Sequence, residues 1–213
     1  MKYDGKNISY NIYDKPKICL VSDINTKTNY ARKIKRGGCI YYSFKKGKLK
    51  LCLGKHELSG DLTDFGGMKN YDEDIIQCAI REGNEETRNA FGIRKIEDVL
   101  SYPILYNINM CIIFIPVEAL GEDDVVELSK CNFNKSKLFD KKCYQEISEL
   151  IWLDEEEIMD IFSVWPKIKL FDKVRRFIVS YFGLNCDIER IKQTLRDYIY
   201  FKADMNNYML LKN

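Results

Sequence analysis

The order of apolar and polar residues predicts strands in the first half of the chain, starting with a possible strand at residues 17–24. Two β-rich runs in GCIYYSFKKGKLKLCLGKH then flank a short Lys/Gly turn, which is the pattern of a β-hairpin. The next segment, GDLTDFGGM at residues 60–68, is predicted to be a glycine-rich loop.

Residues 74–91 have the period of a helix. At about 100° per residue, one side of this helix collects small and apolar positions. These positions are Ile76, Ala79, Ile80, Gly83, Thr87, Ala90 and Phe91. Gly92 follows as a plausible helix terminator.

The second half of the chain mixes strands and helices. Residues 102–120 predict one or two buried strands, and residues 147–162 predict a short strand, a turn and a short acidic helix. Amphipathic helices are predicted over residues 167–182 and 187–204. Strands around a central helix, with further helices at the end, indicate an α/β or α+β fold.

Charge is unevenly placed along these 213 residues, although the net charge is only +2. Residues 15–55 hold twelve Lys or Arg and a single acid, Asp23, whereas residues 121–160 hold twelve acids and five bases. The densest basic cluster is ARKIKR, which contains Lys33, Lys35 and Arg36. Such a stretch suits a polyanionic ligand, and it would equally suit a solvated surface.

The eight cysteines include no C-x-x-C pair, which argues against a zinc site. Several lie inside apolar runs, so they are expected to be buried free thiols in a reducing compartment. The first residues have no signal-peptide pattern, and no run approaches the ~20 apolar residues of a membrane span. The sequence therefore predicts an intracellular protein, located in the cytoplasm, with no membrane partner.

Three glutamates, Glu82, Glu85 and Glu86, are crowded onto one side of the predicted helix. Carboxylates placed so closely repel one another, and the repulsion would raise some of their pKa values. A hard divalent cation with oxygen ligands, Mg²⁺ or Mn²⁺, would remove the conflict. Alone, the three residues would also suit a solvated acidic helix face.

The flanking residues distinguish these alternatives. Gly67, Glu73 and Arg81 stand at the spacings that, with the three glutamates, resemble the Nudix box G-x5-E-x7-R-E-U-x-E-E-x-G-U, where U is aliphatic. The resemblance covers roughly residues 37–184, and its specificity lies mostly in residues 66–86. It implies a Nudix-like α/β/α sandwich with a mixed sheet, preceded by an extension at 1–36 and followed by a helical extension at 185–213.

Two departures from the box concern the helix. Gly83 stands where the family has a bulky aliphatic residue, which either allows close packing or loosens the site. Arg88 and Asn89 stand where Gly and an aliphatic residue are expected, and that pair appears four residues later. We interpret this as an insertion of about one helical turn, with Arg88 pointing to solvent.

The resemblance also implies roles for individual residues. It gives a catalytic set of Arg81, Glu82, Glu85 and Glu86, in which the glutamates bind the metal and the identity of the general base stays open. Gly66 would add its carbonyl oxygen as a metal ligand. Gly67 and Glu73 are expected to support the site, with Glu73 pairing to Arg81 to hold loop to helix.

Three residues outside the box are further candidates. Glu146, six residues before Trp152, would be a further metal ligand or an exposed acid. Lys55 and His56, the only histidine, would contact a substrate phosphate or lie at the surface. Trp152 is predicted to lie in the core, and so is Trp165.

The predicted activity is metal-dependent hydrolysis of a diphosphate linkage in a nucleoside diphosphate joined to another group. The Asn-, Ile-, Lys- and Tyr-rich composition is similar to proteins of large DNA viruses and other AT-rich genomes, which brings in capped RNA as an alternative substrate. A catalytically silent Nudix-type binding domain is the rival from another class. Oligomeric state is left open.

Overall fold

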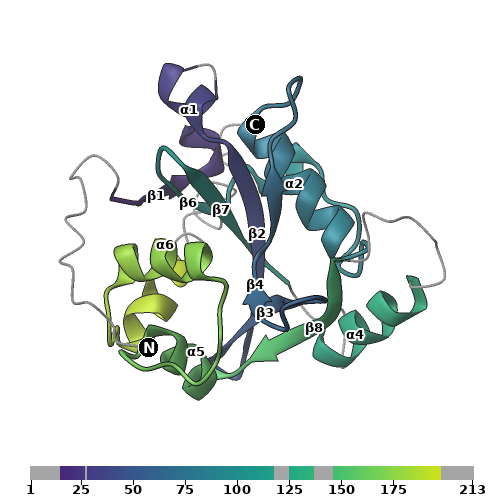
Figure 1. Ribbon diagram of the computed structural model, residues 1–213, viewed down its shortest axis with the longest axis vertical. Helices are drawn as coiled ribbons and strands as arrows, with labels where there is room; N and C mark the ends of the chain where they lie inside the picture. The colour runs from purple at the N-terminus through teal and green to yellow at the C-terminus, as the bar shows by residue number, and fades with distance from the viewer. Residues whose placement is uncertain (1–14, 27, 118–124, 137–145, 198–213) are drawn as a thin grey trace, which may run out of the picture.

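The structure is a computed structural model that describes residues 15–26, 28–117, 125–136 and 146–197 (Figure 1). Its strands are β1 Lys17–Leu20, β2 Arg36–Lys45, β3 Lys48–His56, β4 Leu62–Thr63, β5 Phe65–Met68, β6 Pro103–Tyr106, β7 Met110–Pro116 and β8 Ile147–Leu153. Its helices are α1 Asn29–Lys33, α2 Ile75–Glu86, α3 Ile96–Val99, α4 Val125–Ser136, α5 Glu155–Phe162 and α6 Asp172–Phe182. Residues 188–197 are also helical.

The described strands form one mixed sheet in the order β1-β6-β7-β2-β3-β4, with β5 paired to β2 and β8 paired to β3. The pairing of β2 with β7 is parallel, and the other pairings are antiparallel. Helices cover both faces of this sheet, with α2 on one side and α5 and α6 on the other (Figure 1). The fold is therefore α+β, in agreement with the sequence prediction.

Two cores lie on the two faces of the sheet, and β2 contributes to both. Cys39 and Tyr41 pack in the cluster that contains the apolar residues of α2. Ile40 and Tyr42, the alternate residues, pack in the cluster that contains those of α5 and α6. This alternation follows from the two-residue period of a strand, and it explains why β2 is apolar at consecutive positions.

The predicted hairpin is present as β2 and β3. Its turn residues Lys46 and Gly47 have φ values of 51° and 77°, as a two-residue hairpin turn with matched twist requires. The predicted strands over residues 102–120 and 147–153 are also present, as β6, β7 and β8.

The segment predicted as a glycine-rich loop is instead β4 and β5, so that prediction was wrong. Its glycines form a strand because they pair with glycines of β2: Gly66 lies opposite Gly38 and Gly67 opposite Gly37. A Cβ on Gly66 would lie 2.6 Å from the Cα of Gly38. Only glycines allow the two backbones to approach this closely.

Helix α2 begins with a capping box, in which the Asp74 carboxylate accepts backbone bonds and the Gln77 side chain accepts the Asp74 N–H. It ends at Glu86 and not at residue 91, because Arg88 and Asn89 have φ values of 53° and 57°. The interpretation as an inserted helical turn was therefore wrong, and so was the expectation that Arg88 points to solvent, because its guanidinium lies over the Phe133 ring and donates to Ile147 O at 2.9 Å. Arg88 itself takes up the left-handed conformation for which glycine is favoured.

The ends of the described chain pack onto the same sheet. β1 pairs with β6, which brings residues 17–20 into the sheet. From the helical residues 188–197, Ile191 and Leu195 are buried in the core beside α5 and α6. Helices α1, α3 and α4 were not predicted; they are short or, in α4, carry a mixed pattern of polar and apolar residues.

Burial agrees with most of the sequence predictions. Five of the described cysteines are buried free thiols: Cys39, Cys52, Cys78, Cys111 and Cys186. Trp152 is buried and donates from Nε1 to Ser129 Oγ at 3.0 Å. Trp165 is 80% exposed, so its assignment to the core was wrong: it follows α5, where the chain turns over the surface. In the described part, the helices are too short or too polar to cross a membrane.

Candidate active site

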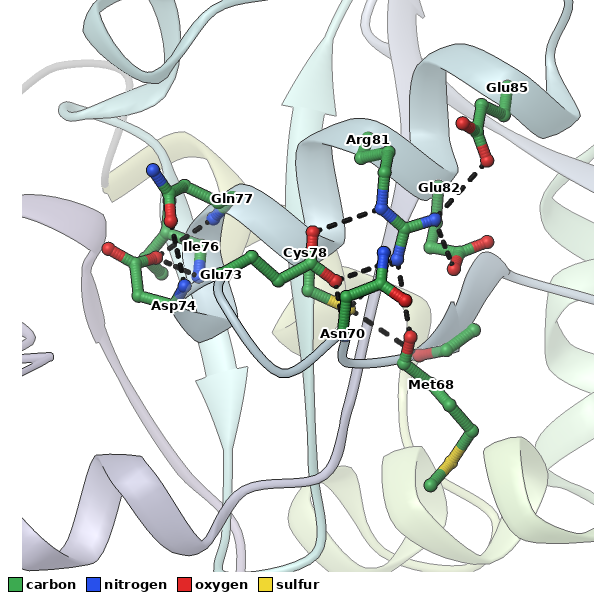
Figure 2. A network of polar contacts seen from close by, with 11 residues as sticks. Met68, Asn70, Glu73, Asp74, Ile76, Gln77, Cys78, Arg81, Glu82 and Glu85 are labelled. Carbon is green, nitrogen blue, oxygen red and sulfur yellow. Dashed lines mark hydrogen bonds and ion pairs between the residues drawn. The ribbon is translucent and has the colours of Figure 1, made fainter.

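Arg81 lies at the centre of a polar network that joins α2 to the segment after β5 (Figure 2). Its Nε and Nη2 donate to both oxygens of Glu73, at 3.0 and 2.7 Å. Its Nη1 donates to Glu82 at 2.7 Å and to Glu85 at 3.2 Å. One guanidinium therefore serves as the counterion of three carboxylates, and a fifth hydrogen bond, to Met68 O at 3.2 Å, ties it to β5.

Glu73 is held from two directions in this network. Besides Arg81, the Asn70 N–H donates to its Oε1 at 2.7 Å (Figure 2). The hydrogen bond from Arg81 lowers the pKa of Glu73, although burial acts in the opposite direction. The two residues thus make a bidentate ion pair between the loop and the helix.

Glu82 lies directly against the backbone of Gly67. A Cβ on Gly67 would lie 2.5 Å from the Glu82 carboxyl carbon, so a side chain there would displace the carboxylate. The pKa of Glu82 is raised. Burial is the main cause, the charges of Glu85 and Glu146 add to it, and Arg81 acts in the opposite direction. The glycine therefore makes room for a carboxylate in a crowded acidic environment.

Glu86 is the most deeply placed of the three glutamates, at 7% exposure. Its Oε2 is buried and has no hydrogen-bond partner among the described residues. Burial and the nearby charges of Asp64 and Glu82 raise its pKa to about 9. A buried carboxylate oxygen without a partner is costly, so this site favours a proton or a cation.

Sequence reasoning missed a second charged pair beside Glu86. The fully buried Asp64 accepts two hydrogen bonds from Arg36, both at 2.7 Å, and Arg36 also donates to Gly66 O at 2.9 Å. Burial opposes the charge of Arg36, but Asp64 outweighs it and raises the Arg36 pKa. A signal was present: the D-F-G-G segment places an acid two residues before Gly66, and Arg36 directly precedes the glycines that open the hairpin.

Gly83 packs closely against β2. A Cβ at this position would lie 3.0 Å from Cys39 Sγ and 3.3 Å from Tyr41 Oη. Of the two sequence interpretations, close packing is the one that matches this geometry. The bulky aliphatic residue of the Nudix box would not fit at this distance.

The further candidates lie at the start of β8 and the end of β3. Glu146 is exposed, and its charge adds to the raised pKa of both Glu82 and Glu86. Lys55 Nζ lies 3.9 Å from Glu149 Oε2 on the neighbouring strand β8. In the turn that follows β3, the backbone N–H of Ser59 donates to His56 Nδ1 at 3.3 Å, and Ser59 Oγ lies 3.3 Å from the same nitrogen.

The arrangement can be compared with what a divalent cation requires. Within the described residues, no three acidic, His or Cys side chains are already gathered around one point. Arg81 engages Glu82 and Glu85, whereas Glu86 keeps a buried free oxygen on the same side of α2. The donors are oxygen atoms, and they carry more negative charge than Arg81 and Arg36 offset, which fits Mg²⁺ or Mn²⁺.

Comparison with known proteins gives structural likenesses alone, since no family model and no curated protein matches the chain. An Ap4A hydrolase from C. elegans is 16% identical, with a TM-score of 0.40 over 69% of this chain and 94% of its own. A MutT/nudix family protein from Enterococcus faecalis is 14% identical, with a TM-score of 0.43 over 70% and 61%. A mutT/nudix family protein from Listeria innocua is 15% identical, with a TM-score of 0.35 over 82% and 96%. At such identities and TM-scores, chemistry has to be inferred from the side chains of the site itself.

Proposed function

We propose that this chain is a Nudix-type hydrolase that cleaves a diphosphate linkage in a nucleoside diphosphate joined to another group. The observation that carries the proposal is the buried Oε2 of Glu86, which lacks a partner beside Glu82 and Asp64. Burying such a group without a partner costs free energy, and a cation bound beside it would offset that cost. The spacing of the Nudix box around the same residues supports the assignment.

The residues proposed to hold Mg²⁺ or Mn²⁺ are Glu82, Glu86 and Glu146, with Glu85 and the carbonyl of Gly66. The Gly66 oxygen already accepts one bond from Arg36, and a carbonyl oxygen has a second lone pair to offer. When bound, the ion would neutralise phosphate charge and lower the pKa of a water molecule.

The side chains of this chain would position the carboxylates, hold the strands together and accept a proton. Arg81 holds Glu82 and Glu85 in position, and Glu73 anchors Arg81 to the loop. The Arg36–Asp64 pair fixes the backbone of β5 against β2 beneath the carboxylates. One acid of the group Glu82, Glu85, Glu86 and Glu146 would accept a proton from the attacking water.

Two alternatives remain within this proposal. Capped RNA as the substrate is favoured by the exposed Lys33 and Lys35 near the site, but Arg36 is occupied by Asp64 and does not extend that basic surface. A binding domain without catalysis was suggested by Gly83 and the altered helix end. Close packing at Gly83 and the left-handed Arg88 account for both without any loss of carboxylates.

A turnover assay tests the proposal. The chain, freed of metal with EDTA, is supplied with Mg²⁺ or Mn²⁺ and offered a panel of nucleoside diphosphate sugars, dinucleoside polyphosphates and capped RNA. Glu86→Gln keeps the shape of the side chain and removes its charge. It should lower kcat by roughly 10²-fold or more, the scale on which one group that stabilises transition-state charge acts.

The matched control is Glu156→Gln on α5, an exposed acid away from the site, which should keep the activity of the parent. Full turnover by Glu86→Gln at saturating Mg²⁺ would contradict the proposed role of Glu86. Absence of turnover over the whole panel, with metal binding retained, would favour the binding domain.

A further inference from the structure

A basic hollow lies beside the acidic site, between α1, the end of β5 and the turn that joins β6 to β7. Its volume is about 520 Å³. Its lining includes Arg32, Lys33, Lys35, Met68, Lys69 and Asn109. Four of these side chains are cationic and none is acidic.

Backbone hydrogen bonds hold the cationic residues together. The Lys69 N–H donates to Lys35 O at 2.8 Å, and the Lys35 N–H donates to Asn109 O at 3.4 Å. The Lys69 ammonium donates to Arg32 O at 3.4 Å. The hollow is therefore formed by the fold itself and does not depend on a ligand.

No ion pair within the described residues holds the cationic side chains of the hollow, which are those of Arg32, Lys33, Lys35 and Lys69. Two of them, Arg32 and Lys69, also line a neighbouring hollow that contains Asp72, Glu73 and Asp74. Arg32 and Lys33 suit the carboxyl end of α1, whose last turn favours cations. That reason does not apply to Lys35 and Lys69, which lie outside the helix, so the cluster as a whole favours a polyanion.

The hollow and the acidic site both involve residues at the end of β5. Met68 lines the hollow, and its carbonyl accepts a bond from Arg81, which holds Glu82 (Figure 2). Gly67, the residue before Met68, contacts the Glu82 carboxylate. Two strand residues span roughly 7 Å, so Lys69 is within reach of a group attached to a ligand that lies at the carboxylates.

We propose that this hollow binds phosphate groups of the substrate that lie outside the diphosphate linkage being cleaved. The inference rests on the proposed function and narrows it to substrates with further phosphates. Such phosphates belong either to the polyphosphate bridge of a dinucleoside polyphosphate or to the strand of a capped RNA. A nucleoside diphosphate sugar has none and would leave the hollow empty.

The direct test measures binding without turnover. Metal-free protein is titrated with a fluorescent single-stranded uridine oligonucleotide at several salt concentrations, and the parent is compared with Arg32→Ser/Lys33→Ser/Lys35→Ser. Affinity should fall on the order of tenfold. Because each lost contact to a single strand removes about 0.7 from the log–log salt slope, the slope should flatten by up to about 2.

The matched control removes the same charge elsewhere in the basic stretch, as Lys45→Ser/Lys48→Ser/Lys50→Ser on the β2–β3 hairpin. It should keep the salt slope of the parent. Circular dichroism and thermal melting check that both variants fold. If the triple variant does not fold, Lys69→Ser, in the segment after β5, repeats the test. This variant removes one phosphate contact instead of three. Equal slopes in the hollow and hairpin variants would exclude an RNA strand, and together with an unchanged KM for a dinucleoside tetraphosphate they would overturn the proposal.

The kinetic test separates the two sources of phosphate. In the hollow variant, KM should rise on the order of tenfold for a dinucleoside tetraphosphate, for a capped oligonucleotide, or for both, with kcat unchanged. A rise for the first alone assigns the hollow to a polyphosphate bridge, and a rise for the second alone assigns it to an RNA strand. KM for a nucleoside diphosphate sugar should not change.

The outcomes also separate this inference from the function on which it rests. If the parent hydrolyses none of the substrates and the salt slope still depends on the hollow, the phosphate site stands and the hydrolase proposal fails. If metal-dependent hydrolysis occurs and KM for every substrate is independent of the hollow, the hydrolase proposal stands and the phosphate site fails.

Discussion

A single guanidinium organises the acidic side of α2. Arg81 contacts Glu73, Glu82 and Glu85 with about a quarter of its side chain exposed, so the interactions are partly desolvated. Without Arg81, these carboxylates would repel one another and would also lose their anchor to the loop. The residue is thus expected to contribute to folding as well as to the geometry of the site.

Arg81→Ala should therefore lower the melting temperature, through a loss of about 1–3 kcal/mol in the free energy of unfolding. Arg81→Lys, the control, keeps the charge but not the bidentate fork, and should recover part of the stability and less of the activity. Thermal melting and kcat are measured for both. Lost activity at an unchanged melting temperature would indicate instead that Arg81 contacts the substrate.

At the level of elements, the distance between α2 and the sheet is set by glycines. A Cβ on Gly37 would lie 2.9 Å from the backbone of Ala79 and of Ile75, and Gly83 packs against Cys39 and Tyr41 one turn along the helix. Helix and strand therefore touch almost backbone to backbone. This approach brings the carboxylates of α2 down to the level of β5 and Asp64.

Gly83→Ala tests this contact. Alanine gains about 1 kcal/mol of helix propensity over glycine, but its Cβ would lie 3.0 Å from Cys39 Sγ, so the two effects should cancel or leave the protein less stable. Gly83→Leu should cost 3 kcal/mol or more, roughly the upper range for overpacking. Denaturant unfolding measures both variants.

A double-mutant cycle isolates the contact between Gly83 and Cys39. Removal of the Cys39 sulfur should make room for the new Cβ, so Gly83→Ala should be better tolerated in a Cys39→Ala background. The coupling energy should be on the order of 1 kcal/mol. Additive effects of the two substitutions would show that the helix and strand do not press on each other here.

Sequence reasoning predicted elements best where the pattern was local. The hairpin follows from two β-rich runs around Lys46 and Gly47, and the start of α2 follows from its apolar period. Residues 60–68 were misread because glycine suggests loops, whereas here it permits a strand against another glycine pair. The end of α2 was misread because Arg88 is not a residue expected in the left-handed conformation, although Asn89 is one that tolerates it.

The site was predictable only over one continuous stretch of sequence, residues 66–86, which the motif covers. The motif spacing named the glutamates, Arg81 and Glu73, and the structure adds their contacts. The pairing of Arg36 with Asp64 is between residues far apart in the sequence, brought together by β2 and β5. No periodicity in a single element encodes such a contact, because it depends on which strands become neighbours.

For the molecule as a whole, the acidic site predicts that stability depends on pH and on metal. The pKa of Glu86 is raised from 4.5 to about 9 in the folded protein, so the folded state binds a proton more tightly than the unfolded state. The stability that this group contributes is fully present below the pKa that Glu86 has in the unfolded chain. It falls as the pH rises from 4.5 towards 9, because the buried carboxylate is then forced to ionise.

In EDTA, the melting temperature should therefore decline as the pH rises through this range. Mg²⁺ should remove the decline, since the cation takes the place of the proton. The stabilisation by Mg²⁺ should grow with pH. In Glu86→Gln the buried group is neutral at every pH. The melting temperature of this variant should therefore lack this part of the decline with pH and most of the increase that Mg²⁺ causes in the parent. An equal Mg²⁺ shift in parent and variant would contradict metal binding at Glu86.

The central position of β2 has a consequence for synthesis of the chain. The β2–β3 hairpin closes through a two-residue turn and can form once residue 56 has left the ribosome. Its outer edges are covered only later, by β7 beside β2 and by β8 beside β3. For much of translation, the nascent protein therefore presents an apolar ribbon with open hydrogen-bonding edges, which is the form most exposed to misassembly and most in need of a chaperone.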